Sequence, residues 1–146
     1  MNNTSTLMNI AKDQFWSWTM ISLWHAEEER ELAGQASVFS FFLARNAIYH
    51  SLRLLDIPRG ANVLAPAYVC RAAIDPLLAY GLNVSFYAVK QDCRPDFDDI
   101  EQKITEKTKA VLVAHYFGFP APVRRLRDLC DKHGLSLIED CAHVLC

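Results

Sequence analysis

The residues with the clearest chemical potential lie near the end of the chain, in the run Leu137-Ile138-Glu139-Asp140-Cys141-Ala142-His143. An apolar stretch that reads as a buried strand ends there in two carboxylates and a histidine. Open α/β sheets bind their ligands at the carboxyl ends of the strands. A carboxylate in such a low-dielectric position can hold a protonated ring nitrogen, because the opposite charge favours the protonated form. The run therefore indicates a ligand site at a strand end.

Three further segments would lie along the same edge of a parallel sheet. They are Ala44-Arg45-Asn46 at the start of a helix, Pro66-Ala67-Tyr68-Val69-Cys70 after a strand, and His115-Tyr116-Phe117-Gly118 after another. A helix N-terminus offers unpaired amides to a phosphate, and an aromatic side chain can stack on a flat ring. These features meet the requirements of pyridoxal phosphate, whose ring nitrogen must stay protonated. The spacing alone does not establish that cofactor.

Each of these residues also has a structural interpretation. Asp140 before Cys141-Ala142 would suit a helix N-cap, and His143 would suit a packed, hydrogen-bonded histidine. For His115 and Tyr116 the structural interpretation is the one we favour, because their pattern fits packing that ties one strand end to its neighbour.

The composition predicts one soluble globular domain with a real core. The 146 residues are 51% hydrophobic and 22% charged, with a formal net charge of −2, so nothing points to nucleic acid. The basic cluster Arg124-Arg125-Arg127 falls in a stretch of helical spacing and reads as a solvated face. Neither a dinucleotide or nucleoside-triphosphate loop nor a Gly-x-Ser-x-Gly elbow is present, which removes the usual support for those enzyme classes.

The five cysteines favour a reduced, cytosolic setting. Their number is odd and no secretory signal precedes them, so a disulfide framework explains them poorly. Cys141, His143 and Cys146 form Cys-x-His-x-x-Cys, which lacks a fourth partner at zinc-like spacing, and we expect no metal site there.

The spacing of apolar residues along the chain changes repeatedly between that of a helix and that of a strand. This alternation predicts the elements that position the candidate site residues. Ser37 to Phe42 fits either a short strand or an extended lead-in. The expected helices span 44–55, 70–80, a stretch opened by Asp96, and 121–133, and the expected strands span 62–65, 83–89, 109–115 and 135–139. Strands that alternate with helices of this length predict an α/β fold with a mostly parallel sheet flanked by helices.

Residues 1–36 read as an amphipathic helical arm, separate from a domain over 37–146. The arm carries the most aromatic run of the sequence, Phe15 to Trp24, followed by the acidic run Glu27 to Glu31. The aromatic run is too short to span a bilayer, which takes ~20 apolar residues. We expect the arm to cover another surface, on this domain or on a partner subunit.

In four segments, in order, the chain resembles the DegT/DnrJ/EryC1/StrS group of pyridoxal-phosphate enzymes, chiefly sugar aminotransferases with the aspartate-aminotransferase fold. The segments are Arg45-Asn46-Ala47, the run from Pro58 to Tyr68, the run from Thr108 to Gly118, and the run from Leu135 to His143. The last contains Glu-Asp-x-Ala-His, which is similar to the family's Glu-Asp-x-Ala-Gln/His. The resemblance implies an incomplete large domain of pyridoxal-phosphate fold type I over 37–146.

The resemblance also implies cofactor roles for individual residues. Asp140 would pair with the pyridine nitrogen of pyridoxal phosphate, and His143 would contact the side of the ring that carries the phenolic oxygen. Ala44, Arg45 and Asn46 would line the phosphate, with Ala44 at a position where relatives usually have glycine. The ring stacker would be Tyr68 or the residue at position 70, where Cys70 aligns with the family's usual aromatic.

The family holds its cofactor as a Schiff base on a lysine that follows the Glu-Asp-x-Ala-His motif. Every lysine of this chain precedes Asp140. We therefore expect an N-terminal fragment of a cytoplasmic, homodimeric aminotransferase that takes a small-molecule amino donor and a keto-sugar or related ketone, and that is inactive alone.

Two alternatives stay open. One is a non-catalytic α/β module derived from the family and kept for binding or dimerisation. The other is a different α/β enzyme or receiver-like domain in which Asp140 is a phosphate or metal ligand, although that needs acidic residues at several strand ends. Since half a sheet leaves an unpaired edge and exposed apolar faces, we also expect the isolated chain to be poorly soluble.

Overall fold

The computed structural model describes residues 39–143. The chain divides into two units, Met1–Phe42 and Leu43–Cys146, and the architecture below is that of the second. The arm predicted over residues 1–36 lies outside the described residues, as does Cys146. Residues 39–42, the described part of the stretch predicted as a short strand or an extended lead-in, form no strand.

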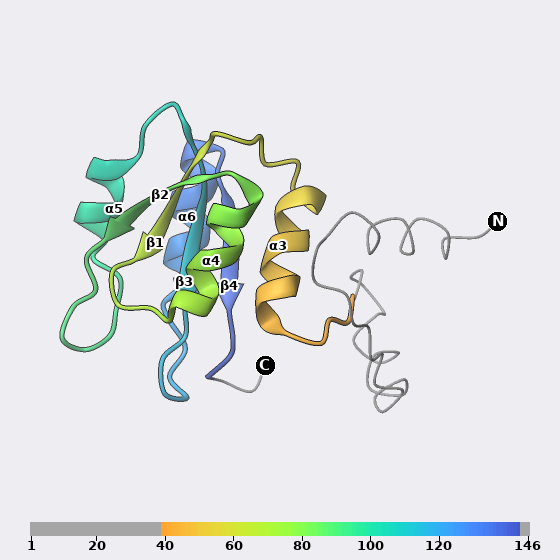
Figure 1. The fold of residues 1–146 in the computed structure, drawn as a ribbon. Coiled ribbons are helices and arrows are strands. Elements are labelled where there is room, and N and C mark those ends of the chain that lie inside the picture. Colours follow the sequence, from red (N-terminus) through yellow and green to blue (C-terminus); the bar gives the residue numbers. More distant parts are fainter. Residues whose placement is uncertain (1–38, 144–146) are drawn as a thin grey trace, which may run out of the picture. The chain divides into compact units, whose positions relative to one another are not determined.

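Four parallel strands form the sheet. They are β1 (Asn62–Pro66), β2 (Asn83–Tyr87), β3 (Thr108–Ala114) and β4 (Ser136–Asp140), in the spatial order β2-β1-β3-β4 (Figure 1). The register pairs Val63 with Val84 on one side of β1, and Ala114 with Asp140 between β3 and β4. Because all strands run the same way, their carboxyl ends meet at one edge of the sheet.

Helices cover both faces of this sheet (Figure 1). The helices are α3 (Ala44–Leu54), α4 (Arg71–Tyr80), α5 (Phe97–Lys103) and α6 (Val123–His133). The connection from β1 to β2 moves toward one edge, while those from β2 to β3 and from β3 to β4 move toward the other. Right-handed crossovers in opposite directions place their helices on opposite faces. Accordingly α4 packs with α3 on one face, and α5 and α6 occupy the other.

Two hydrophobic clusters hold these layers together. The first joins α3 and α4 to the sheet and includes Leu52, Leu77 and Leu112. The second lies under α5 and α6 and includes Ile100 and Leu126. Strands buried on both faces need continuous apolar runs, which explains why the apolar stretch in β3 showed no alternation in the sequence.

The helix ends follow the local signals in the sequence. Gly81 and Gly134 end α4 and α6 in the left-handed conformation, with φ of 93° and 63°. Asp96 caps α5: its side chain accepts hydrogen bonds from the amides of Asp98 and Asp99. Among residues 39–143, no helix combines the length and apolar character needed to cross a membrane.

The two edges of the sheet differ. Along β2, Lys103 Nζ donates to the carbonyl of Phe86 (2.8 Å), and Asp99 Oδ2 accepts from the amide of Ala88 (2.7 Å). Helix α5 thus occupies part of the outer side of β2. On β4, the outward backbone groups of Leu137 and Glu139 have no hydrogen-bond partner among the described residues.

Candidate functional site

A pocket of about 180 Å³ lies at the carboxyl ends of the strands. Strand order reverses between β1 and β3, and open α/β sheets bind ligands at such a switch point. Four segments supply the walls: the start of α3, the loop from β1 into α4, the end of β3, and the end of β4. The lining residues are Ala44, Arg45, Ile48, Val69, Cys70, Ala72, Ala73, Ala114, His115, Tyr116, Asp140, Ala142 and His143.

Asp140 is the last residue of β4 and faces this pocket. Its backbone carbonyl accepts a hydrogen bond from the amide of His115 (3.1 Å), which fixes the strand end against β3. Its Oδ1 accepts from the amide of Ala142 (3.1 Å). Within the described residues, Asp140 therefore caps a turn and not a helix. Oδ2 has no hydrogen-bond partner there, which leaves it available to a ligand in the pocket.

Two helix N-termini open at the pocket without a side-chain cap. Helix α3 begins after Leu43, and α4 begins after Cys70, and neither residue caps its helix through its side chain. Ala44 and Arg45, the first residues of α3, line the pocket. Uncapped amides and the helix dipole favour an anion such as phosphate. Away from the pocket, α5 is capped by Asp96, while α6 begins after Pro122 without a side-chain cap.

The structure brings five of the seven predicted site residues together around the pocket: Asp140, His143, Ala44, Arg45 and Cys70. The other two do not line it. Asn46 is half-buried in the first turn of α3, where its amide bonds to the carbonyl of Leu43. Tyr68 is 59% exposed.

His143 sits at the rim and is exposed. Its imidazole stacks on the ring of Phe117, with the centroids 5.8 Å apart and the planes 20° from parallel. The histidine therefore contacts Phe117 through its ring and at the same time lines the pocket.

Tyr116 is a pocket residue that sequence reasoning placed among the structural ones. Its hydroxyl donates a hydrogen bond to the carbonyl of Tyr68, which ties the end of β3 to the loop after β1. Burial, with smaller contributions from neighbouring Cys93, Tyr68 and Asp140, raises the pKa of Tyr116 to about 12. The small residues Ala72, Ala73 and Ala114 were also missed, because an alanine carries no chemical signal in a sequence.

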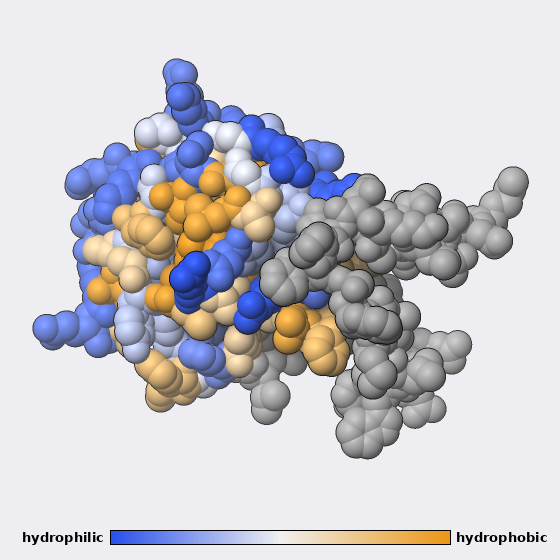
Figure 2. All heavy atoms as spheres, viewed as in Figure 1, coloured by the Kyte–Doolittle hydropathy of each residue, from blue (hydrophilic) through white to orange (hydrophobic). Residues whose placement is uncertain are grey.

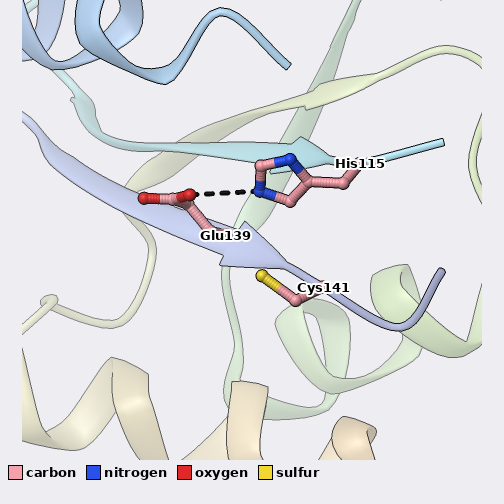
Figure 3. Close-up of side chains that lie close together, drawn as sticks. All are labelled: His115, Glu139 and Cys141. Carbon is pink, nitrogen blue, oxygen red and sulfur yellow. Dashed lines mark hydrogen bonds and ion pairs between the residues drawn. The ribbon is translucent and has the colours of Figure 1, made fainter. Parts of the chain in front are cut away.

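His115, which also lines the pocket, forms a compact cluster with Glu139 and Cys141 (Figure 3), with one potential metal-ligand atom of each within 4.8 Å of the others. His115 Nε2 lies 3.1 Å from Glu139 Oε2, and Nδ1 accepts the amide of Ala121 at 3.0 Å. Nδ1 therefore carries no proton, and Nε2 donates its own to Glu139. A metal-bound histidine normally donates its second ring N–H. The arrangement thus favours a structural tie over a metal site.

The pocket offers a donor set that fits pyridoxal phosphate. A carboxylate suits the protonated ring nitrogen, uncapped helix amides suit the phosphate, and Ile48, Val69 and Ala73 supply apolar wall for a flat ring. Among the described residues, no lysine lines this pocket.

Comparisons with known proteins agree with this fit. The sequence matches the profile of the DegT/DnrJ/EryC1/StrS aminotransferase family over residues 8–146. GDP-perosamine synthase of Vibrio cholerae is 34% identical over 100 residues, which are 68% of this chain and 27% of the relative. UDP-N-acetyl-3-dehydro-alpha-D-glucosamine 3-aminotransferase of Acidithiobacillus ferrooxidans is 32% identical over 129 residues, 80% of this chain and 33% of the relative.

Solved structures of the same kind share the fold. DesV of S. venezuelae is 33% identical with a TM-score of 0.66, over 68% of this chain and 27% of that one. NtdA from Bacillus subtilis, solved with bound cofactor PMP, is 27% identical with a TM-score of 0.66, over 69% of this chain and 23% of that one. The predicted fold class is thereby confirmed as part of the α/β domain of fold-type I sugar aminotransferases.

The chain spans about a quarter to a third of the length of the curated relatives it matches. Within that span the motifs that carried the resemblance in the sequence lie on the strand ends and helix starts of a shared fold. The chain belongs to the DegT/DnrJ/EryC1/StrS aminotransferase family.

Proposed function

We propose that this chain supplies the ring and phosphate contacts of a pyridoxal-phosphate-dependent sugar aminotransferase. The proposal depends mainly on the position of Asp140, whose Oδ2 is available to a ligand in the pocket. Helices α3 and α4 begin at the same pocket without a side-chain cap. A ligand with a cationic ring nitrogen at one end and a phosphate at the other matches both features, because the carboxylate binds the nitrogen and the helix N-termini bind the phosphate.

Four of the lining residues have a defined task in this proposal. Asp140 holds the proton on the ring nitrogen, since a nearby carboxylate stabilises the cationic form. The amides of Ala44 and Arg45, with the Arg45 side chain, bind the phosphate. His143 donates a hydrogen bond toward the phenolic oxygen. Pyridoxal phosphate, when bound, supplies an electron sink for the substrate.

The ring face needs a neighbour, and the pocket offers Cys70 beside Val69. Tyr68, the other predicted stacker, contributes its carbonyl to Tyr116 and lies outside the lining. We therefore assign the contact with the ring face to Cys70. A thiol gives less contact area than an aromatic ring, so this contact is weaker than a stacking one.

The amino acceptor in this proposal is a nucleotide-linked keto-sugar, and the amino donor is a small molecule. Support comes from the names of the relatives, one of which aminates position 3 of a UDP-linked dehydro-glucosamine. The proposal includes a cytoplasmic homodimer as the working form of the complete enzyme. Since no described lysine reaches the pocket, the chain by itself binds the amine form of the cofactor and does not transaminate.

Pyridoxamine phosphate tests the binding part, because it binds without a lysine. Titration followed by calorimetry should give saturable binding that Asp140→Asn weakens about ten- to a hundredfold, the worth of one charged hydrogen bond. Asp98→Asn, on the first turn of α5, is the matched control and should leave binding unchanged. Absence of saturable binding by the wild-type chain would exclude the proposal in favour of a non-catalytic module.

Borohydride reduction in the presence of pyridoxal phosphate tests whether the chain by itself lacks a lysine that can bind the cofactor covalently and is therefore unable to transaminate. We expect no cofactor fixed to a single lysine, as judged by absorbance and peptide mass. Stoichiometric fixation at one lysine would show that a residue of this chain does reach the cofactor and would overturn that part.

A further inference from the structure

The residues after β3 form a tight turn in an unusual conformation. The amide of Phe119 donates to the carbonyl of Tyr116 (2.8 Å), and the two central residues, Phe117 and Gly118, have φ of 54° and 87°. Two positive φ values define a type I′ turn, in which asparagine, aspartate and glycine are preferred. A phenylalanine there is strained, because its Cβ crowds the backbone in the left-handed region.

Core packing does not explain this phenylalanine. Phe117 is 62% exposed, so little of its ring is buried by the domain. Its ring stacks on His143, with centroids 5.8 Å apart, and lies tilted against the ring of Tyr116, with centroids 6.1 Å apart, and both of these partners line the pocket. A strained residue whose main contact is with a pocket residue suggests a role at the pocket.

The turn is anchored on both sides of the pocket. Tyr116, at its base, donates its hydroxyl to the carbonyl of Tyr68 in the loop after β1, and their rings lie 5.7 Å apart. Phe117, at its tip, reaches the segment after β4. The left-handed conformation at Phe117 lets successive residues of one turn make both contacts.

We propose that Phe117 is a positioning residue that holds the imidazole of His143 at the rim of the pocket. The cofactor part of this inference rests on the proposed function above. Stacking restricts the rotation of the imidazole, so the ring is already oriented when a ligand enters and less conformational entropy is lost on binding. Phe117 itself does not touch the reacting atoms.

Proton NMR of the imidazole signals tests the stack in the chain as it exists. His143→Gln identifies the His143 signals among those of the five histidines. In the wild type, the ring current of Phe117 should move the His143 ring protons upfield, and Phe117→Leu should abolish that shift. Phe119→Leu is the matched control, since Phe119 lies in the same turn with 77% exposure, and it should leave the signals in place.

A second variant guards against unfolding. Asparagine tolerates the left-handed conformation, so Phe117→Asn should melt at the same or a higher temperature than the wild type and still lose the His143 shift. His143 signals that are identical in wild type and Phe117→Asn would overturn the positioning role.

Binding of pyridoxamine phosphate then connects the stack to the site. We expect Kd to rise about three- to tenfold in Phe117→Leu and Phe117→Asn, the range of one aromatic contact, and to stay unchanged in Phe119→Leu. An unchanged Kd beside a lost shift would overturn the cofactor part alone. A wild-type chain that shows the shift but binds no pyridoxamine phosphate would overturn the proposed function and leave the stack established.

Discussion

Neighbouring residues at the end of β3 serve opposite faces of the sheet. Successive residues of a strand point to opposite sides. Both residues line the pocket, but the His115 side chain, 5% exposed, is tied to Glu139 and to the loop before α6, whereas the Tyr116 hydroxyl bonds to the loop after β1. One strand end thus fixes β4 and shapes the site at once.

Removal of the Tyr116 hydroxyl tests this tie. We expect Tyr116→Phe to lower the free energy of unfolding by about 1 kcal/mol, because the carbonyl of Tyr68 loses its donor. Tyr68→Phe is the matched control, because it keeps the Tyr68 carbonyl and should lower the free energy of unfolding by less than Tyr116→Phe does. Urea denaturation measures both, and equal losses would argue against the hydrogen bond.

The raised pKa of Tyr116 leads us to expect that the free energy of unfolding falls at alkaline pH. The pKa of Tyr116 is raised from 10.0 to about 12, so the folded chain keeps a proton that the unfolded chain has lost. This contribution to stability is complete below pH 10 and disappears as the pH rises through about 12. Tyr116→Phe should flatten the decline in unfolding free energy over that range.

At the scale of elements, the helix starts divide into two kinds. Helix α5 has the Asp96 cap, whereas α3, α4 and α6 begin without a side-chain cap, and of these three only α3 and α4 begin at the pocket. An uncapped N-terminus leaves amide donors unsatisfied, which costs stability unless water or a ligand binds them. The amides at the starts of α3 and α4 are therefore free of a side-chain cap where a ligand in the pocket could meet them, and the uncapped start of α6 shows that a missing cap alone does not mark a site.

Asp96 provides the test at this scale. Its Oδ1 lies 3.2 Å from the amide of Asp98 and 3.4 Å from that of Asp99. Asp96→Ala should lower the unfolding free energy by about 1 kcal/mol, whereas Asp96→Asn retains a cap acceptor and should change it by a few tenths. Thermal melts that rank the two variants equally would contradict the capping role.

The whole domain is asymmetric. The outer side of β2 is partly occupied by Lys103 and Asp99, while the outward groups of β4 lack partners among the described residues. Figure 2 also shows hydrophobic residues gathered on the displayed face; exposed apolar side chains include Leu78 of α4 and Phe86 of β2. An open strand edge beside apolar surface favours association.

We therefore expect the purified chain to self-associate or to be poorly soluble. Sedimentation velocity over a concentration series should show a sedimentation coefficient that rises with concentration. The opposite result would be a monodisperse monomer that melts cooperatively at every concentration, and it would mean that the β4 edge is covered.

The sequence by itself determined the element types and the family, and it predicted that the candidate site lies at strand ends. Periodicity and glycine stops depend on neighbours along the chain, so they predicted the strand over 62–65 and the end of α6 at Gly134. Local signals were less reliable at element ends: the strand predicted over 83–89 ends at Tyr87.

Only the tertiary structure decided the strand order, which two of the predicted site residues do not line the pocket, and which contacts cross the pocket. Asn46 and Tyr68 have suitable chemistry, but the helix rotation and the loop path turn them away from the lining. The stack of Phe117 on His143 joins residues that are far apart in the sequence. Such contacts depend on how parallel strands align at one edge, and no local pattern encodes that alignment.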